Sequence, residues 1–288
     1  MNKITRRLLI FFIGVPVFYV IIFLLPFYRH LALNIAANIF AALCALEFSS
    51  MLGKKQIHIK KAEAVILGTL ATIAATLTVS FNFSEWIAPL LLMAGFGWVL
   101  LSRIFTSSEK METVISRLVG GFSLIVYPGF FIFWIIKMGT WENSGAIFLF
   151  FLLTFFNDST AWLSGMLFGK NNRGLIPASP NKSIAGFIGG IFASVVIACI
   201  AAVFFPSFYF AAKNTPLSNL IVKAVILGLF TSVFANLGDL AESAIKRSSD
   251  FKDSGTIMMG RGGALDSSDS LAVAAPVYFL LYSVFFYF

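Results

Sequence analysis

The stretch from residue 183 to residue 205, SIAGFIGGIFASVVIACIAAVFF, contains no charged residue. A helix rises about 1.5 Å per residue, so a stretch of this length can cross the hydrocarbon core of a bilayer, which is about 30 Å thick. Its apolar residues are continuous and do not alternate with polar ones, which favours a helix over a transmembrane β-strand. The stretch therefore predicts a membrane-spanning helix.

Similar runs recur along the whole chain. Of its 288 residues, 59% are hydrophobic and 12% are charged, whereas about 25% are charged in soluble domains. We therefore predict an all-α, polytopic integral membrane protein with about nine transmembrane helices. The expected spans are residues 8–28, 31–52, 62–81, 86–105, 113–136, 144–168, 183–205, 219–242 and 269–287.

Basic residues predict the orientation of these spans. If the N-terminus is cytosolic, the 21 lysines and arginines all fall on the cytosolic side except Arg29, Lys137, Lys213 and Lys223. This distribution follows the positive-inside rule. The net charge of +8 is then a topology signal and an attraction to anionic lipid, and we expect no nucleic-acid partner. The two cysteines fall in different spans, so we expect neither a disulfide nor a cysteine metal site.

The two halves of the chain differ in polar content. Residues 1–140 are expected to form transmembrane helices without evident chemistry, and residues 141–288 a catalytic transmembrane domain with a polar site facing the cytosol. In the first half, Glu47 is interpreted as an interfacial polar group. His30 and His58 are far apart and have no acidic neighbours, so a histidine relay or zinc site is not expected.

All six aspartates lie in the second half. Asp158 follows Asn157 deep within an apolar run, where an aspartate costs about 2.5 to 3.5 kcal/mol on insertion scales. We interpret this pair as the lining of a polar cavity. The alternative is an asparagine and an aspartate that hold neighbouring helices together.

A second group of polar residues lies at the end of an apolar run, in ANLGDLAESAIKR (residues 235–247). Asp239, Glu242 and Lys246 have the spacing i, i+3, i+7, which places them on one face of a helix, and Ser243 extends that face. Two acids and a lysine on one face suit a cation together with an anionic ligand. A solvated helix end is the alternative.

The third group lies in KDSGTIMMGRGGALDSSDS (residues 252–270). Asp266 and Asp269 are spaced i, i+3 and can point to one side. Two carboxylates about 4 Å apart repel by about 4 kcal/mol at an effective dielectric constant of 20, unless a proton or cation lies between them. Oxygen ligands without imidazole or thiolate favour magnesium, manganese or calcium over zinc.

The same stretch carries features of a polyphosphate site. Its glycines would allow the backbone to approach a ligand closely, and an arginine among them can bind phosphate with two N–H groups. These residues are Gly260, Arg261, Gly262 and Gly263, and the basic residues that flank them are Lys246, Arg247 and Lys252.

A fourth polar segment is GKNNRGLIPASPNKSIAGFIGG (residues 169–190), which is cytosolic in the predicted orientation. Ser179, Lys182 and Ser183 could bind phosphate oxygens at the start of the next helix. A simple turn and helix cap is an equally good interpretation.

The order and spacing of these motifs resemble the phosphatidate cytidylyltransferase (CDP-diacylglycerol synthase) family over about residues 155–275. The similarity is carried by NDSTAWLSGMLFGK, SPNKSIAGFIGG, GDLAESAIKR, KDSG and GRGGALDSSDS. This chain has Arg261-Gly262-Gly263 where the family usually has His-Gly-Gly, Asp266-Ser267-Ser268-Asp269 where it has Asp-Arg-x-Asp, and Ala185 where a glutamate is common.

The resemblance implies an enzyme that makes CDP-diacylglycerol and pyrophosphate from CTP and phosphatidate. It implies Mg²⁺, with a second cation left open, a homodimer, and a place in the bacterial inner membrane with the active site on the cytosolic face. The expected catalytic residues are Asp239, Lys246, Lys252, Asp253, Asp266 and Asp269, and the expected metal ligands are Asp239, Asp266 and Asp269. The expected substrate-binding residues are Asn157, Asp158, Ser179, Lys182, Ser183, Glu242, Ser243, Arg247, Gly260, Arg261, Gly262 and Gly263.

Three alternatives remain open from the sequence. Polar residues within spans are also typical of an ion-coupled transporter, although here they gather at one face and no internal repeat is evident. A related CTP-using enzyme could act on a different lipid. A CDP-alcohol phosphatidyltransferase needs acids separated by three residues, whereas two residues separate Asp266 from Asp269.

Overall fold

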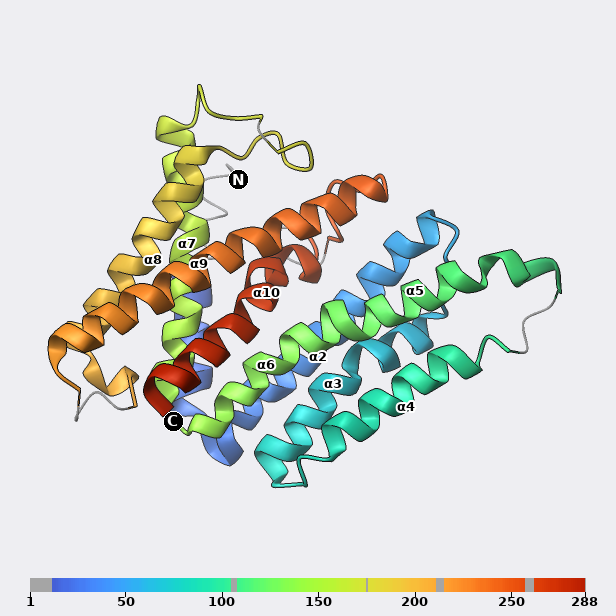
Figure 1. Ribbon diagram of the computed structural model, residues 1–288, viewed down its shortest axis with the longest axis horizontal. Helices are drawn as coiled ribbons and strands as arrows, with labels where there is room; N and C mark the ends of the chain where they lie inside the picture. The colour runs from blue at the N-terminus through green and yellow to red at the C-terminus, as the bar shows by residue number, and fades with distance from the viewer. Residues whose placement is uncertain (1–11, 105–107, 175, 211–214, 257–261, 288) are drawn as a thin grey trace. The chain divides into compact units, whose positions relative to one another are not determined.

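The computed structural model describes residues 12–104, 108–174, 176–210, 215–256 and 262–287 (Figure 1). All regular secondary structure in these ranges is helical, which confirms the predicted all-α class. The α-helices are α2 (Phe27–Lys54), α3 (Lys61–Phe81), α4 (Ile87–Leu101), α5 (Val114–Leu124), α6 (Phe131–Lys137), α7 (Ser144–Phe168), α8 (Ile184–Phe204), α9 (Leu217–Ser248) and α10 (Ala264–Tyr282).

Length and hydropathy identify the chain as an integral membrane protein. Within the described residues, seven helical segments are long and apolar enough to span a membrane: Phe27–Lys54, Lys61–Phe81, Met111–Trp141, Ser144–Phe168, Ile184–Phe204, Leu217–Ser248 and Ala264–Tyr287. The other two expected spans correspond to shorter apolar helices, Phe12–Leu24 and Ile87–Leu101. The 15-residue helix α4 is about 22 Å long, less than the bilayer core of about 30 Å. The count of nine spans and their orientation therefore stay predictions.

The chain forms two compact units that interleave in the sequence. The first, which we call the α2–α6 unit, comprises Phe27–Lys137 and Lys246–Ser267. The second, the α7–α10 unit, comprises Met1–Pro26, Met138–Ile245 and Ser268–Phe288. The sequence motifs predicted a division after residue 140, based on where the polar residues lie, and that division stays a prediction. The compact units are divided differently, because residues 246–267 belong to the α2–α6 unit.

In the α2–α6 unit, α3 packs against α2 and α4 and against the helical run from α5 to α6 (Figure 1). Pro128 lies between α5 and α6, in a π-helical turn over Ile125–Phe130. Proline lacks a backbone N–H, and the wider turn accommodates the interruption, so the run remains helical. Gly129 lies against the carbonyl group of Gly68, where a Cβ would be 2.8 Å from the oxygen.

In the α7–α10 unit, small residues allow the helices to approach closely. The Ser194 hydroxyl of α8 donates a hydrogen bond to the Leu153 carbonyl of α7 at 2.9 Å. A Cβ at Gly228 of α9 would lie 2.9 Å from the Ser194 carbonyl oxygen, and a Cβ at Gly238 would collide with the backbone of Asp269 in α10. Close backbone contact thus brings the polar ends of α9 and α10 together.

Two helices extend beyond the expected membrane spans. Helix α9 continues to Ser248, past the span end expected at residue 242, and α10 begins at Ala264, five residues before the expected start of the span, in agreement with the helical spacing assigned to Lys246 and Asp266. Lys246 therefore lies in the last turn of α9, where the helix dipole favours a cation. Asp266 lies in the first turn of α10, where the dipole favours an anion.

The predicted orientation can be tested on the α2–α3 hairpin. Lys55 follows α2, Asn82 follows α3, and both are exposed. With Cys44 and Cys199 replaced by alanine, we expect a membrane-impermeant maleimide to label Asn82→Cys in intact cells and Lys55→Cys only after permeabilisation. Both variants should react in permeabilised cells, and the opposite pattern in intact cells would reverse the topology.

Candidate functional site

Glu47 of α2 is buried and binds the start of α10 within the α2–α6 unit. Its Oε1 accepts a hydrogen bond from the backbone N–H of Ala264 at 2.9 Å, and its Oε2 accepts one from the N–H of Leu265 at 2.9 Å. The Ser254 hydroxyl also lies 2.8 Å from Oε2. A carboxylate from a distant helix thus caps the first two residues of α10.

Asp266 completes this cap from within α10. Its Oδ2 accepts hydrogen bonds from the backbone N–H groups of Ser254 and Gly263, both at 2.7 Å, and lies 2.8 Å from the Ser254 hydroxyl. The N–H of Asp266 donates to the Ser254 hydroxyl oxygen at 3.2 Å. Helix starts leave their first backbone donors without helical partners. Glu47, Asp266 and Ser254 supply partners for all four N–H groups from residue 263 to residue 266.

Lys246 neutralises the second oxygen of Asp266. The Lys246 ammonium forms an ion pair with Oδ1, and both side chains are largely buried, with exposed fractions of 12% and 6%. Asp266 therefore has one oxygen in an ion pair and the other in three hydrogen bonds. Charge-assisted bonds of this kind are roughly twice as strong as neutral ones.

The glycines beside this cap allow close approach to carboxylates. A Cβ at Gly263 would meet both carboxylate oxygens of Glu47 and the Ser254 hydroxyl, and one at Gly262 would meet Oδ2 of Asp266. Gly262 also has a φ of +100°, in the region that favours glycine. The space beside both residues is thus filled by the protein's own carboxylates, and their assignment to phosphate binding stays a prediction.

The structure adds to the interpretation of Glu47. The sequence suggested an interfacial polar group without chemistry, whereas the side chain is 7% exposed, accepts two backbone hydrogen bonds and lies 2.8 Å from the Ser254 hydroxyl. Its partners lie more than 200 positions away in the sequence, so no local pattern could reveal them. The one available signal was a carboxylate within an apolar helix, which usually implies a specific partner.

The second group of predicted residues lies in the α7–α10 unit. Lys182, which precedes α8, forms an ion pair with Asp239 of α9, with Nζ 2.6 Å from Oδ2. The exposed fractions of the two side chains are 22% and 39%. The Lys182 Nζ itself is buried, so within the pair the exposed surface belongs mainly to Asp239.

Acidic side chains surround Asp269 in this unit. Asp269 is 7% exposed, and its Oδ1 accepts a hydrogen bond from the backbone N–H of Ser270 at 2.6 Å. The carboxylates of Asp239, Glu242 and Asp158 lie close enough to repel that of Asp269. Grouped carboxylates in a partly buried site favour a bound cation, because a cation removes their mutual repulsion.

The donor atoms of this acidic group fit a hard divalent cation. They are all carboxylate oxygens, the ligands that Mg²⁺ prefers. Among the described residues, no three His, Cys, Asp or Glu side chains are arranged to hold a metal by themselves. Mg²⁺ is usually bound through one or two carboxylates, waters and substrate phosphates, so the acids of this unit fit that mode. The ligand set of Asp239, Asp266 and Asp269 stays a prediction.

Asn157 is fully buried at the junction of three helices of the α7–α10 unit. Its Oδ1 accepts a hydrogen bond from the Ser232 hydroxyl of α9 at 2.6 Å, and its Nδ2 donates to Oδ1 of Asn236 at 3.2 Å. A Cβ at Gly190 of α8 would lie 2.5 Å from its Oδ1. These contacts favour the alternative in which Asn157 holds helices together.

The segment before α8 contains the predicted helix cap. Ser183 is the N-cap residue, and its hydroxyl oxygen accepts a hydrogen bond from the backbone N–H of Gly186 at 3.1 Å. Ser183 is 4% exposed, while Ser179 is half-buried in the preceding turn. The turn-and-cap interpretation is therefore confirmed for Ser183, and a phosphate contact by either serine stays a prediction.

The remaining predicted residues are more exposed. Ser243 is half-buried on α9, while Arg247, Lys252 and Asp253 are exposed. Gly260 and Arg261 lie outside the described residues. Arg247 and Lys252 are thus available to a ligand, and their assignment to phosphate binding stays a prediction.

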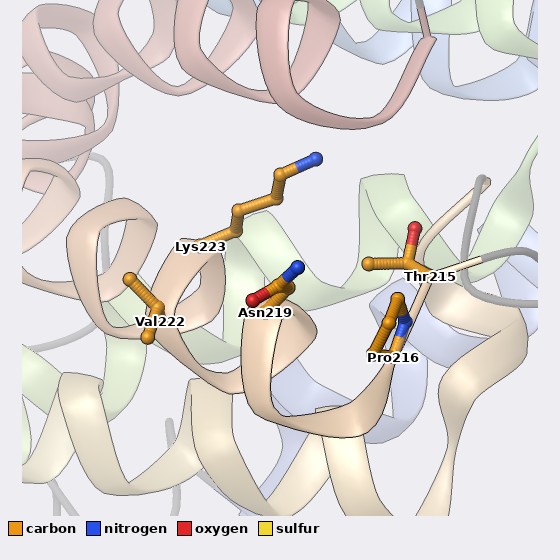
Figure 2. A pocket seen from close by; sticks show the side chains of 5 residues that line it. All are labelled: Thr215, Pro216, Asn219, Val222 and Lys223. Atoms are coloured by element: carbon orange, nitrogen blue, oxygen red, sulfur yellow. The ribbon is translucent and has the colours of Figure 1, made fainter.

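A hollow at the other end of α9 is separate from these groups (Figure 2). It is lined by Thr215, Pro216, Asn219, Val222 and Lys223. The Lys223 ammonium donates a hydrogen bond to the Phe285 carbonyl at 2.8 Å. Asn219 and Asp239 are about 30 Å apart along the helix. The hollow therefore does not belong to the acidic group.

These features define an integral membrane protein whose helix ends carry paired lysines and carboxylates. Its sequence matches the cytidylyltransferase family over residues 5–285, and the chain belongs to that family. The family predicted from the C-terminal motifs is thereby confirmed, and the match includes the N-terminal helices.

Named relatives agree with this placement. The chain is 36% identical over 188 residues to the phosphatidate cytidylyltransferase of Bacillus subtilis (strain 168), which covers 64% of this chain and 62% of that protein. It is 41% identical over 128 residues to the phosphatidate cytidylyltransferase of Staphylococcus haemolyticus (strain JCSC1435), covering 44% of this chain and 45% of that protein. The aligned parts thus span less than two thirds of these relatives.

The packing of the α10 cap can be tested by substituting Gly263. Gly263→Ala would place a methyl group against Glu47 and Ser254, and we expect it to lower the free energy of unfolding by about 1–3 kcal/mol. Gly97→Ala on α4 is the matched control, because a Cβ there meets nothing within 4 Å. Thermal unfolding of both variants in detergent measures the difference. Equal stability of the two would contradict the packing described.

A second test addresses Asn157. Asn157→Ala leaves the buried polar groups of Ser232 and Asn236 without this partner, and we expect a loss of about 1–3 kcal/mol in unfolding free energy. Thr154→Val is the control, because the Thr154 hydroxyl donates to the carbonyl groups of Phe150 and Phe151 in its own helix. If Asn157→Ala unfolds like the control, Asn157 does not hold the helices together.

Proposed function

We propose that this protein transfers CMP from CTP to phosphatidate, giving CDP-diacylglycerol and pyrophosphate for phospholipid biosynthesis. The observation that carries the proposal is the family match over residues 5–285, together with relatives named phosphatidate cytidylyltransferase. The lysine and carboxylate pairs add support, because a nucleoside triphosphate and its cation need groups of both signs.

The proposed reaction needs little acid–base chemistry from the protein. A phosphate monoester has a second pKa of about 6, so the phosphatidate headgroup is largely dianionic at pH 7. One of its oxygens attacks the α-phosphorus of CTP in line, while the bond from that phosphorus to the β-phosphate oxygen breaks. Pyrophosphate leaves with the electron pair of that bond. The protein then contributes positioning and charge stabilisation.

The lysines have a direct role in this proposal. Lys182 and Lys246 each pair with a carboxylate that we propose as a metal ligand, Asp239 and Asp266 respectively. Asp239, Asp266 and Asp269 would each be a ligand for Mg²⁺, and the ammonium groups of Lys182 and Lys246 would bind oxygens of the triphosphate. Mg²⁺, with or without a second cation, would neutralise charge on the triphosphate oxygens.

Other parts of the proposal concern the surroundings. Lys252, Arg247 and Arg261 would assist phosphate binding at the cytosolic face, Asp253 would be a further acid beside the metal, and Asp158 would line the route of the lipid headgroup. The protein would lie in the bacterial cell inner membrane, and the bacterial source of the named relatives supports the bacterial part of this proposal. A homodimer is proposed from the family resemblance, and cross-linking in native membranes would test it.

The activity is tested with the full-length protein in detergent micelles that contain phosphatidate, labelled CTP and Mg²⁺. We expect CDP-diacylglycerol and pyrophosphate in equal amounts, and no product when the metal is chelated. Asp269→Asn should lower kcat by more than about 100-fold. Replacing a residue that only supports a metal ligand lowers activity by about 10- to 100-fold, so a larger loss indicates a direct ligand. Product from another lipid alone would change the substrate, and absence of any CTP-dependent product would reject the function.

The control for that experiment is Asp250→Asn. Asp250 is exposed and pairs with Lys55 at 3.5 Å, away from the residues proposed for catalysis. We expect its activity to stay within about twofold of wild type, since exposed ion pairs contribute little. Full turnover by Asp269→Asn would reject the metal role of that carboxylate.

A further inference from the structure

Glu47 is a buried acid that the proposed chemistry does not use. It comes from α2, and both of its carboxylate oxygens accept hydrogen bonds from the backbone of residues 264 and 265. Burying a charged glutamate within an apolar helix is energetically unfavourable, so the burial needs a compensating interaction. The compensation here is the start of α10, the helix that carries Asp266.

Ser254 connects Glu47 to Asp266. Its hydroxyl oxygen lies 2.8 Å from Oε2 of Glu47 and 2.8 Å from Oδ2 of Asp266. A hydroxyl has one proton, so it donates to one carboxylate at a time and ties both to the same atom. The Ser254 N–H holds Oδ2 of Asp266 as well. Any shift of Glu47 is therefore passed to the carboxylate of Asp266.

The packing leaves little freedom around Glu47. A Cβ at Gly255 or Gly263 would collide with its carboxylate oxygens, so the backbone of both residues lies directly against them. Glutamine has a single acceptor oxygen in its side chain, so it would place an NH₂ group against the N–H of Ala264 or Leu265. Glu47→Gln should therefore disturb the cap with almost no change in side-chain volume.

We propose that Glu47 is a positioning residue for the cytidylyl transfer described above. It fixes the carboxylate of Asp266 through Ser254 and the first turn of α10, and it does not touch substrate. This inference rests on the proposed function, and it deepens that function by adding a residue from the N-terminal helices. The competing explanation is that Glu47 only stabilises the fold.

Kinetics of the full-length protein separate these two explanations. We expect Glu47→Gln to lower kcat by about 10- to 100-fold and to raise the Mg²⁺ concentration for half-maximal activity, as disturbing an outer-shell partner does. Glu63→Gln is the matched control, because Glu63 is a glutamate of the same unit that pairs with Arg103 at 2.7 Å. It should keep kcat and the Mg²⁺ requirement within about twofold, as expected for a change away from the site.

A role in folding alone gives a different result. It would lower the yield of folded Glu47→Gln while kcat per folded molecule and the Mg²⁺ requirement stay at wild-type values, and that outcome overturns the proposal. Ser254→Ala should reproduce the rise in the Mg²⁺ requirement. The fold-increase in the Mg²⁺ requirement of the double variant should then be smaller than the product of the two single-variant increases, because both substitutions act through one contact. Independent effects would also overturn the proposal.

Hydrogen exchange gives a readout that does not depend on turnover. We expect Mg²⁺ and CTP to slow amide exchange in residues 254–256 and 262–266 of the wild-type protein, and Glu47→Gln to abolish this protection. If the wild-type protein forms no product, the proposed function fails and the inference, which rests on it, fails with it. If the wild-type protein turns over, protection that is equal in both proteins, or absent from both, overturns the inference alone.

Discussion

The start of α10 depends on three side chains that take up its unpaired amides. Glu47, Ser254 and Asp266 accept from all four N–H groups between residues 263 and 266. Each buried donor left without a partner would cost about 1–3 kcal/mol, and two carboxylates also complement the positive end of the helix dipole. The position of the Asp266 carboxylate follows from this cap.

Two lysines balance the charge of two carboxylates. Lys246 balances Asp266 in the α2–α6 unit, and Lys182 balances Asp239 in the α7–α10 unit. Each pair joins an acid that the sequence assigned to metal binding with a base that it assigned to phosphate binding. Charged side chains that are already paired and partly buried have lost most of their hydration before a ligand binds. A ligand that carries both a cation and phosphates can therefore replace these ion pairs with a small additional desolvation free energy.

Much of the fold follows from the sequence, because long apolar runs have few structural solutions in a bilayer. The predicted span 144–168 coincides with α7, and Asp239 and Glu242, which were expected on one face of a helix, both lie close enough to Asp269 to repel its carboxylate. The expected span began at residue 269, after the polar residues 266–268, whereas α10 starts at Ala264. Glu47 binds the backbone of Ala264 and Leu265, and a contact across more than 200 residues leaves no local pattern. Asn157 was ambiguous for another reason, since a buried amide suits a cavity and a helix junction equally well.

The separation of Glu47 from its partners also bears on biosynthesis. Ala264 follows Glu47 by 217 positions, and at about 5–20 residues per second the ribosome needs about 10 to 40 s to make that stretch. During this time α2 carries a carboxylate that lacks the amides it later binds. The last helix can acquire its capped start only after nearly the whole chain has been inserted, so the order of translation delays the assembly of the acidic end of α10 until the surrounding helices are in place.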